Sequence, residues 1–182
     1  MRHLPNLLTC LRLALVLPVA WLLLRQQYPQ ALWLFLLAGL SDALDGLLAR
    51  RFGWTSRLGA WLDPIADKLL LVISYVCLTL NGLVPVWLTA VLLLRDLVIV
   101  GGAGAFRYRV GALDIRPTWL GKCSTVLQIV LVLALLLETS LLPGMGPANH
   151  VLLPLVALLT LSSGAHYVWQ WTTLYRRHKA CP

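Results

Sequence analysis

Charged residues are scarce in this chain. Only 12% of its 182 residues are charged and 59% are hydrophobic, whereas soluble domains carry about 25% charged residues. This composition excludes an ordinary soluble globular domain. Several apolar runs reach about 20 residues, which is the length that crosses a bilayer. We therefore expect a single polytopic membrane domain over residues 1–182, without a separate soluble domain.

Cysteines in metal-binding or redox motifs are also absent. The four cysteines at positions 10, 77, 123 and 181 are widely separated, and they form no CxxC motif and no zinc-type pattern with histidine. The sequence therefore predicts neither a disulfide framework nor a zinc site.

Acidic residues are the rarest charged class, with 7 Asp and Glu against 15 Lys and Arg, which gives a net charge of +8. A basic excess is typical of nucleic-acid binding. This chain, however, has no basic stripe interleaved with aromatic residues for stacking bases, and we expect no nucleic-acid partner. In such an apolar chain, lysines and arginines instead mark loops that face anionic lipid headgroups.

Six apolar segments predict an all-α protein with six transmembrane helices and a short N-terminal interfacial segment. The segments are 7–24, 30–49, 59–80, 84–105, 118–137 and 150–171. Arg12 interrupts the first run and no small-residue cleavage site follows it, so an uncleaved helix is favoured over a signal peptide.

The distribution of lysine and arginine predicts the topology. Most of them lie at one set of segment ends, and the loops at the opposite ends hold only Arg25. By the positive-inside rule, both termini are cytoplasmic. We expect an integral protein of the bacterial inner (plasma) membrane, in contact with the lipid bilayer.

Four of the seven acidic residues lie within positions 41–68. Asp42 and Asp45 are three residues apart, and Asp63 and Asp67 are four apart, so each pair lies on one face of a helix. Both pairs lie near the cytoplasmic ends of consecutive segments joined by a short basic loop. We expect these helices to be antiparallel neighbours whose acidic faces meet.

Four clustered carboxylates near a membrane need a compensating cation. One charged side chain at mid-bilayer costs about 2.5–3.5 kcal/mol on insertion scales, less near the interface, and the carboxylates also repel one another. Carboxylate oxygens suit Mg²⁺ or Mn²⁺, and two such ions would bridge the site and clamp a pyrophosphate. The alternative is pairing with Arg50, Arg57 and Lys68. The small residues on or near the acidic faces, Gly46, Ala49, Gly59 and Ala60, permit close helix packing and also leave room for a nucleotide, and both can hold at once.

The pattern Asp42-x2-Asp45-Gly46-x2-Ala49-Arg50-x8-Gly59-x3-Asp63-x3-Asp67 resembles the signature of the CDP-alcohol phosphotransferases at every fixed position. This family is also called the CDP-alcohol phosphatidyltransferases. The segment Pro5-Asn6-x2-Thr9-x2-Arg12 is similar to the family's N-terminal segment. Six helices fit the family's fold, so the resemblance covers most of the chain.

The resemblance implies transfer of a phosphatidyl group from CDP-diacylglycerol to an alcohol, with release of CMP. It implies that Asp42, Asp45, Asp63 and Asp67 hold two divalent cations, Mg²⁺ or Mn²⁺. Asp67 would also act as general base on the acceptor hydroxyl. The residues implied to bind the CDP-lipid are Asn6, Thr9, Gly46, Ala49, Arg50, Ser56 and Gly59. The family also implies a homodimer, and the run of small residues at 101–105 permits close helix contact.

The acceptor is predicted from basic residues. Arg95 lies inside the fourth apolar segment, and Arg107, Arg109 and Lys122 follow it. An intramembrane arginine is a functional hypothesis by default, and its fork suits a phosphate oxygen. These residues favour an acceptor that carries its own phosphate. The alternative is that Arg95 pairs with one of the motif aspartates.

Two branches of the family share features with this chain. The stretches 6–9, 63–68 and 121–128 resemble phosphatidylglycerophosphate synthases, which use glycerol 3-phosphate, although Arg95-Asp96 stands where that branch usually has Arg-Glu. The stretches 106–109 and 116–119 resemble eukaryotic-type cardiolipin synthases, which use phosphatidylglycerol. We favour glycerol 3-phosphate, with phosphatidylglycerol as the alternative.

Two other classes are less favoured. A small transporter with an acidic cation site would spread its acids along a path, whereas here they cluster towards one membrane face and no broken-helix repeat is visible. A catalytically inactive scaffold would be expected to lose at least one of the four aspartates, and all four are present.

Overall fold

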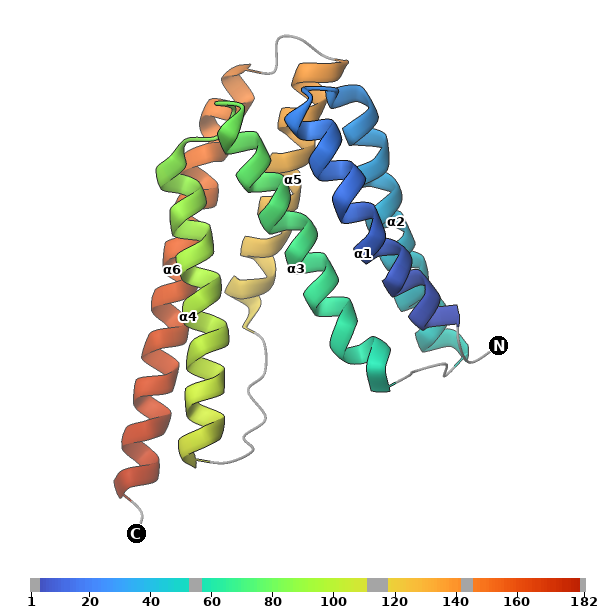
Figure 1. Cartoon of the computed structure of the whole chain (residues 1–182). Helices are drawn as coiled ribbons and strands as arrows, with labels where there is room; N and C mark the ends of the chain where they lie inside the picture. Colours follow the sequence, from blue (N-terminus) through green and yellow to red (C-terminus); the bar gives the residue numbers. More distant parts are fainter. Residues whose placement is uncertain (1–3, 53–56, 111–117, 142–145, 181–182) are drawn as a thin grey trace. The chain divides into compact units, whose positions relative to one another are not determined.

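Every regular element in the described part of the chain is an α-helix (Figure 1). This computed structural model describes the backbone of residues 4–52, 57–110, 118–141 and 146–180, and the side chains of 11–41, 65–102, 118–141 and 148–173. The six helices are α1 (Leu4–Leu24), α2 (Tyr28–Phe52), α3 (Arg57–Leu80), α4 (Val86–Val110), α5 (Trp119–Ser140) and α6 (Gly146–Ala180). The all-α prediction is confirmed.

Each predicted segment corresponds to one helix, but several helices are longer than predicted. Because α1 begins at Leu4, residues from Leu4 onward belong to the first helix rather than to a separate interfacial segment. Likewise, α6 runs from Gly146 to Ala180, beyond both ends of the predicted 150–171. The length of an apolar run reflects the thickness of the bilayer core, and it does not mark where the helix ends. Helical hydrogen bonding continues into polar residues until a breaker ends it.

Tight turns follow α1 and α3. Gln26, between α1 and α2, and Gly82, between α3 and α4, have φ values of 59° and 77°. Glycine adopts this conformation at little cost, whereas glutamine does so rarely. The Asn81 side chain donates a 2.7 Å hydrogen bond to the Leu23 carbonyl. This bond ties the end of α1 to the end of α3.

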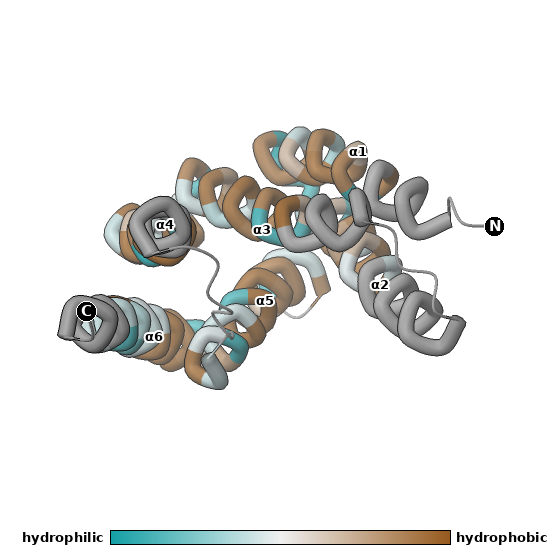
Figure 2. The backbone as a smooth tube through the Cα atoms, turned by 90° about the horizontal axis from the view of Figure 1, so that it is seen from below, coloured by the Kyte–Doolittle hydropathy of each residue, from teal (hydrophilic) through white to brown (hydrophobic). Residues whose placement is uncertain are grey.

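The first of two compact units contains residues Met1–Val84 and Val132–Gly146. Within it, α1 packs against both α2 and α3, and hydrophobic residues run along the described parts of α1 and α3 (Figure 2). Val16, Val19 and Leu23 are buried at helical spacing on one face of α1. The predicted meeting of the acidic faces of α2 and α3 falls on side chains outside the described ranges.

The second unit contains residues Pro85–Leu131 and Pro147–Pro182, and so includes α4, the first part of α5, and α6. The indole of Trp171 on α6 packs directly on Gly102 of α4. A Cβ added at Gly102 would overlap the Trp171 ring, whereas one added at Gly101 would meet nothing within 4 Å. Gly102 is therefore the residue that allows α4 and α6 to approach closely.

Two helical stretches in the described part of the chain are long and apolar enough to cross a membrane: Trp119–Ser140 and Ala148–Thr173. The apolar stretches Leu11–Leu24 and Tyr28–Ser41 are shorter. Large apolar side chains such as Leu17 and Val86 are more than 70% exposed, as expected for lipid-facing positions. Two such stretches do not confirm six crossings, and the shorter stretches in α1 and α2 begin or end where the described side chains do.

Candidate active site

Asp67 is the only one of the four predicted aspartates whose side chain is described. It lies on α3 directly after Ala66, which is completely buried, yet the Asp67 side chain is 44% exposed. Arg12 of α1 donates from Nη1 to Asp67 Oδ1 at 3.0 Å. The arginine itself is only 1% exposed. The carboxylate is therefore bonded to a buried cation, while part of the Asp67 side chain lies at the protein surface.

The backbone places most other predicted site residues on helices. Asp42 and Asp45 lie in α2, and Asp63 lies in α3 with Asp67, so the intervals of three and four residues do fall on helices. The side chains of Asn6, Thr9, Asp42, Asp45, Gly46, Ala49, Arg50, Gly59, Asp63, Arg107 and Arg109 lie outside the described ranges, as does the whole of Ser56.

Most of the predicted metal ligands have side chains outside the described ranges, namely Asp42, Asp45 and Asp63. Among the side chains that the structure describes, no three histidines, cysteines or acids lie close enough together to hold a metal ion. Since three of the four predicted ligands are not among them, the metal site remains a prediction.

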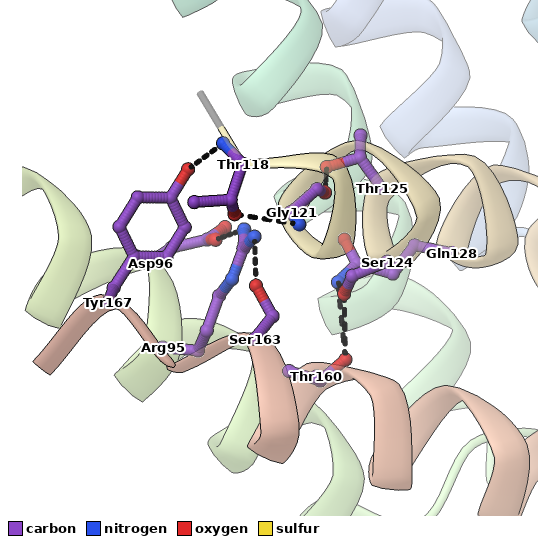
Figure 3. A network of polar contacts seen from close by, with 10 residues as sticks. All are labelled: Arg95, Asp96, Thr118, Gly121, Ser124, Thr125, Gln128, Thr160, Ser163 and Tyr167. Atoms are coloured by element: carbon purple, nitrogen blue, oxygen red, sulfur yellow. Dashed lines mark hydrogen bonds and ion pairs between the residues drawn. The ribbon is translucent and has the colours of Figure 1, made fainter. Parts of the chain in front are cut away.

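A second polar cluster lies in the other compact unit, around Arg95 of α4 (Figure 3). Its Nη1 donates to Asp96 Oδ1 at 2.9 Å, and its Nη2 donates to Ser163 Oγ of α6 at 3.0 Å. Arg95 is 7% exposed, and its Nε makes no hydrogen bond to any residue in the described ranges. Among the described side chains, the ion-pair partner of Arg95 is its own neighbour, Asp96.

Tyr167 of α6 extends this cluster to the start of α5. Its hydroxyl accepts a 3.2 Å hydrogen bond from the backbone N–H of Thr118, and the Thr118 hydroxyl accepts one from the N–H of Gly121 (Figure 3). These contacts satisfy two backbone donors at the N-terminus of α5 that have no partner within the helix.

A buried hydroxyl and amide group lies further along α5 and α6. Gln128 donates to Ser124 and to Thr160 at 3.2 and 3.4 Å, and both hydroxyls are nearly inaccessible. Hydrogen bonds between helices are the ordinary role of such residues in membrane bundles. Lys122, predicted to bind the acceptor, is exposed, and its Nζ lies 5.5 Å from the centroid of the Trp119 ring.

Comparison with known proteins decides the family. Residues 2–169 match the sequence model of the CDP-alcohol phosphatidyltransferases. The chain belongs to this family. The resemblance read from the aspartate signature is therefore confirmed, and the match spans segments of both compact units.

Similar members of the CDP-alcohol phosphatidyltransferase family carry two kinds of name. A CMP-forming cardiolipin synthase of Streptomyces coelicolor is 42% identical over 66% of this chain and 59% of its own length. The rat cardiolipin synthase is 36% identical over 71% of this chain and 48% of its own. A probable phosphatidylglycerophosphate synthase of Mycobacterium tuberculosis is 35% identical over 91% of this chain and 80% of its own. The chain thus spans about half the length of some curated relatives.

Three buried polar residues of α6 were not predicted from the sequence. Thr160, Ser163 and Tyr167 lie three and four residues apart, which places them on one face of α6, and each is at most 6% exposed. A polar stripe at this spacing within an apolar segment was a readable signal. The contact between Arg12 and Asp67 had no such local signal, because the two residues are far apart in the sequence.

Proposed function

We propose that this chain is a membrane enzyme that transfers a phosphatidyl group from CDP-diacylglycerol to an alcohol, releasing CMP. The supporting observation is membership of the CDP-alcohol phosphatidyltransferase family together with all four signature aspartates. The Asp67 geometry fits this chemistry, since its Oδ1 accepts a hydrogen bond from Arg12 while the side chain is 44% exposed.

The donor set suits two Mg²⁺ or Mn²⁺ ions, because hard cations prefer carboxylate oxygens. Asp42, Asp45, Asp63 and Asp67 would hold them. When bound, such ions neutralise negative charge on the phosphates of the CDP-lipid. An exposed carboxylate like that of Asp67 has room for this role, whereas a fully buried ion pair would not.

The residues of this chain divide the remaining tasks. Asp67 accepts the proton of the acceptor hydroxyl while that oxygen bonds to the phosphorus carrying diacylglycerol. The bond from this phosphorus to the CMP oxygen breaks, and CMP leaves. Arg50 and Ser56 contact the diphosphate. The residues beside the cytidine and phosphates are Asn6, Thr9, Gly46, Ala49 and Gly59.

The proposed setting is the cytoplasmic face of a bacterial inner membrane. Six crossing helices put both termini on one side, and the excess of lysine and arginine makes this side cytoplasmic. A homodimer is part of the proposal, and within the run of small residues at 101–105 Gly101 suits the contact, because Gly102 already packs against Trp171 of the same chain.

Glycerol 3-phosphate is the proposed acceptor. The Mycobacterium tuberculosis relative, which aligns over 91% of this chain, is named a probable phosphatidylglycerophosphate synthase. Arg95, Arg107, Arg109 and Lys122 would bind the acceptor's phosphate. The second candidate is phosphatidylglycerol, because the 42% identical relative is named a cardiolipin synthase. Both acceptors offer a glycerol hydroxyl close to a phosphate.

A CMP-release assay tests the reaction and separates the two acceptors. Purified protein in detergent, with Mn²⁺ and CDP-diacylglycerol, is given glycerol 3-phosphate, phosphatidylglycerol, inositol phosphate or serine. We expect CMP release with glycerol 3-phosphate and formation of phosphatidylglycerophosphate. CMP release with phosphatidylglycerol but not with glycerol 3-phosphate would reassign the acceptor. If none of the four alcohols supports CMP release, the transferase proposal is refuted.

Substitution of Arg95 in the same assay tests the acceptor site. We expect Arg95→Gln to raise the KM for glycerol 3-phosphate by about 10-fold or more, because a hydrogen bond to a charged group contributes about 1.5–3 kcal/mol. The KM for CDP-diacylglycerol should not change. Arg25→Gln is the control, since Arg25 is exposed against Trp21 outside the proposed site. An unchanged acceptor KM in Arg95→Gln would remove Arg95 from the site.

A further inference from the structure

Arg12 is an arginine enclosed in the core of the first compact unit. It is 1% exposed and is among the largest fully buried side chains of the described residues. It precedes Val16, Val19 and Leu23 at intervals of four, three and four residues, so it lies on the same buried face of α1. Because a guanidinium stays charged at any relevant pH, its burial is costly unless an anion accompanies it.

Asp67 supplies that anion, but the two partners differ in exposure. The Nη1–Oδ1 distance is 3.0 Å, and the exposed fractions of the two side chains are 1% and 44%. A pair that served packing alone would be expected to enclose both charges. Here the cation is fixed in the core and the carboxylate projects from it. The guanidinium is therefore a fixed hydrogen-bond donor to a carboxylate that lies partly at the protein surface.

We infer that Arg12 is a positioning residue, which fixes the side-chain rotamer of Asp67 for catalysis. An aspartate on a helix otherwise samples more than one χ1 rotamer. A charge-assisted hydrogen bond to a buried donor selects one of them. This inference rests on the proposed function, in which Asp67 takes the acceptor proton and helps to hold the cations. Partners that orient such ligands typically contribute about 10–100-fold to metal affinity or activity.

The position of α1 strengthens this inference. Within the described residues α1 packs against α2 and α3, the two helices that carry the signature aspartates. The hydrogen bond from Arg12 thus fixes Asp67 of α3 relative to α1, the helix that packs against both α2 and α3. The Asn81–Leu23 hydrogen bond ties the same two helices at their other ends. Of these two hydrogen bonds, the one from Arg12 is made to a signature residue, Asp67.

The test compares Arg12→Met and Arg12→Lys with the full-length protein in detergent. We expect Arg12→Met to lower kcat for CMP release and to weaken Mn²⁺ binding, measured calorimetrically without substrate, by about 10–100-fold each. Arg12→Lys should recover part of both losses, because an ammonium supplies charge but not the rigid fork. The KM for the acceptor alcohol should change little.

A second measurement separates positioning from general stability. Thermal unfolding in chelator of Arg12→Met, Asp67→Ala and the double variant should be non-additive, because each single change removes one partner of the same hydrogen bond. Arg25→Met, which removes an exposed arginine just beyond the same helix, should match the parent protein in every readout. Both Arg12 variants must be assayed well below their unfolding temperatures.

The outcomes also distinguish this inference from the proposed function. If the parent protein releases CMP and the folded Arg12→Met variant matches it in kcat and in Mn²⁺ affinity, Arg12 has only a structural role and the inference is wrong. A lower unfolding temperature with unchanged Mn²⁺ affinity leads to the same conclusion. If the parent protein releases no CMP with any alcohol, the proposed function itself fails, whatever the Arg12 variants do.

Discussion

Asp67→Asn is expected to reduce CMP release by at least about 100-fold, because general-base catalysis typically contributes 10²–10⁴-fold. Asparagine keeps the size of the side chain, and its amide oxygen can still accept the hydrogen bond from Arg12. It cannot accept the proton of the acceptor hydroxyl, and it is a poorer ligand for a hard cation. The measurement is the rate of CMP release with saturating CDP-diacylglycerol and acceptor.

Glu138→Gln is the matched control for this substitution. It makes the same change from carboxyl to amide near the end of α5, where no site residue is predicted. Both variants should keep the helical circular dichroism spectrum of the parent protein. Parent-like turnover in a folded Asp67→Asn variant would assign the base to another group. A comparable loss in Glu138→Gln would show that the effect is not specific to the site.

Removal of divalent cations is expected to stop the reaction completely. With EDTA in excess, CMP should form no faster than without enzyme, because the carboxylates alone cannot neutralise the phosphates of the CDP-lipid. Adding Mg²⁺ or Mn²⁺ beyond the chelator should restore the rate, whereas Ca²⁺ should restore less, since it prefers longer bonds and more ligands.

The unfolding temperature, measured in parallel, controls for damage by the chelator. If the protein stays folded in EDTA and regains full activity on addition of metal, the cations act in the reaction. Turnover that continues at the parent rate in EDTA would mean that the four aspartates serve another purpose, with pairing to Arg50, Arg57 and Lys68 as the first alternative.

The helices were largely predictable from the sequence, although their ends were not. Apolar runs located all six helices of the described residues, because burial in lipid or protein selects the same side chains. Hydropathy places an end where apolar residues stop, whereas the helix stops where backbone hydrogen bonds stop. The polar continuation of α6 to Ala180 therefore lay outside the predicted segment, as did the first residues of α1.

The site was predictable where its chemistry is local in sequence. The aspartate intervals indicate two acidic helix faces by their spacing alone, and the family match confirms the resemblance built on them. Contacts between distant residues carry no such pattern. Arg12 meets Asp67 across 55 positions, and Arg95 meets Ser163 across 68. Such pairs follow from how helices pack, which the spacing within one helix does not specify.

Direct counting of bound Mn²⁺ tests the central proposal, in which carboxylates of α2 and α3 jointly hold two cations. Equilibrium dialysis with electron paramagnetic resonance of the purified protein should give two Mn²⁺ per chain, with the spin–spin coupling of neighbouring ions. Asp42→Asn on α2 and Asp63→Asn on α3 should each reduce the number bound, and Glu138→Gln should not. Absence of bound Mn²⁺ in the parent protein, or full binding in both aspartate variants, would contradict a shared cation site.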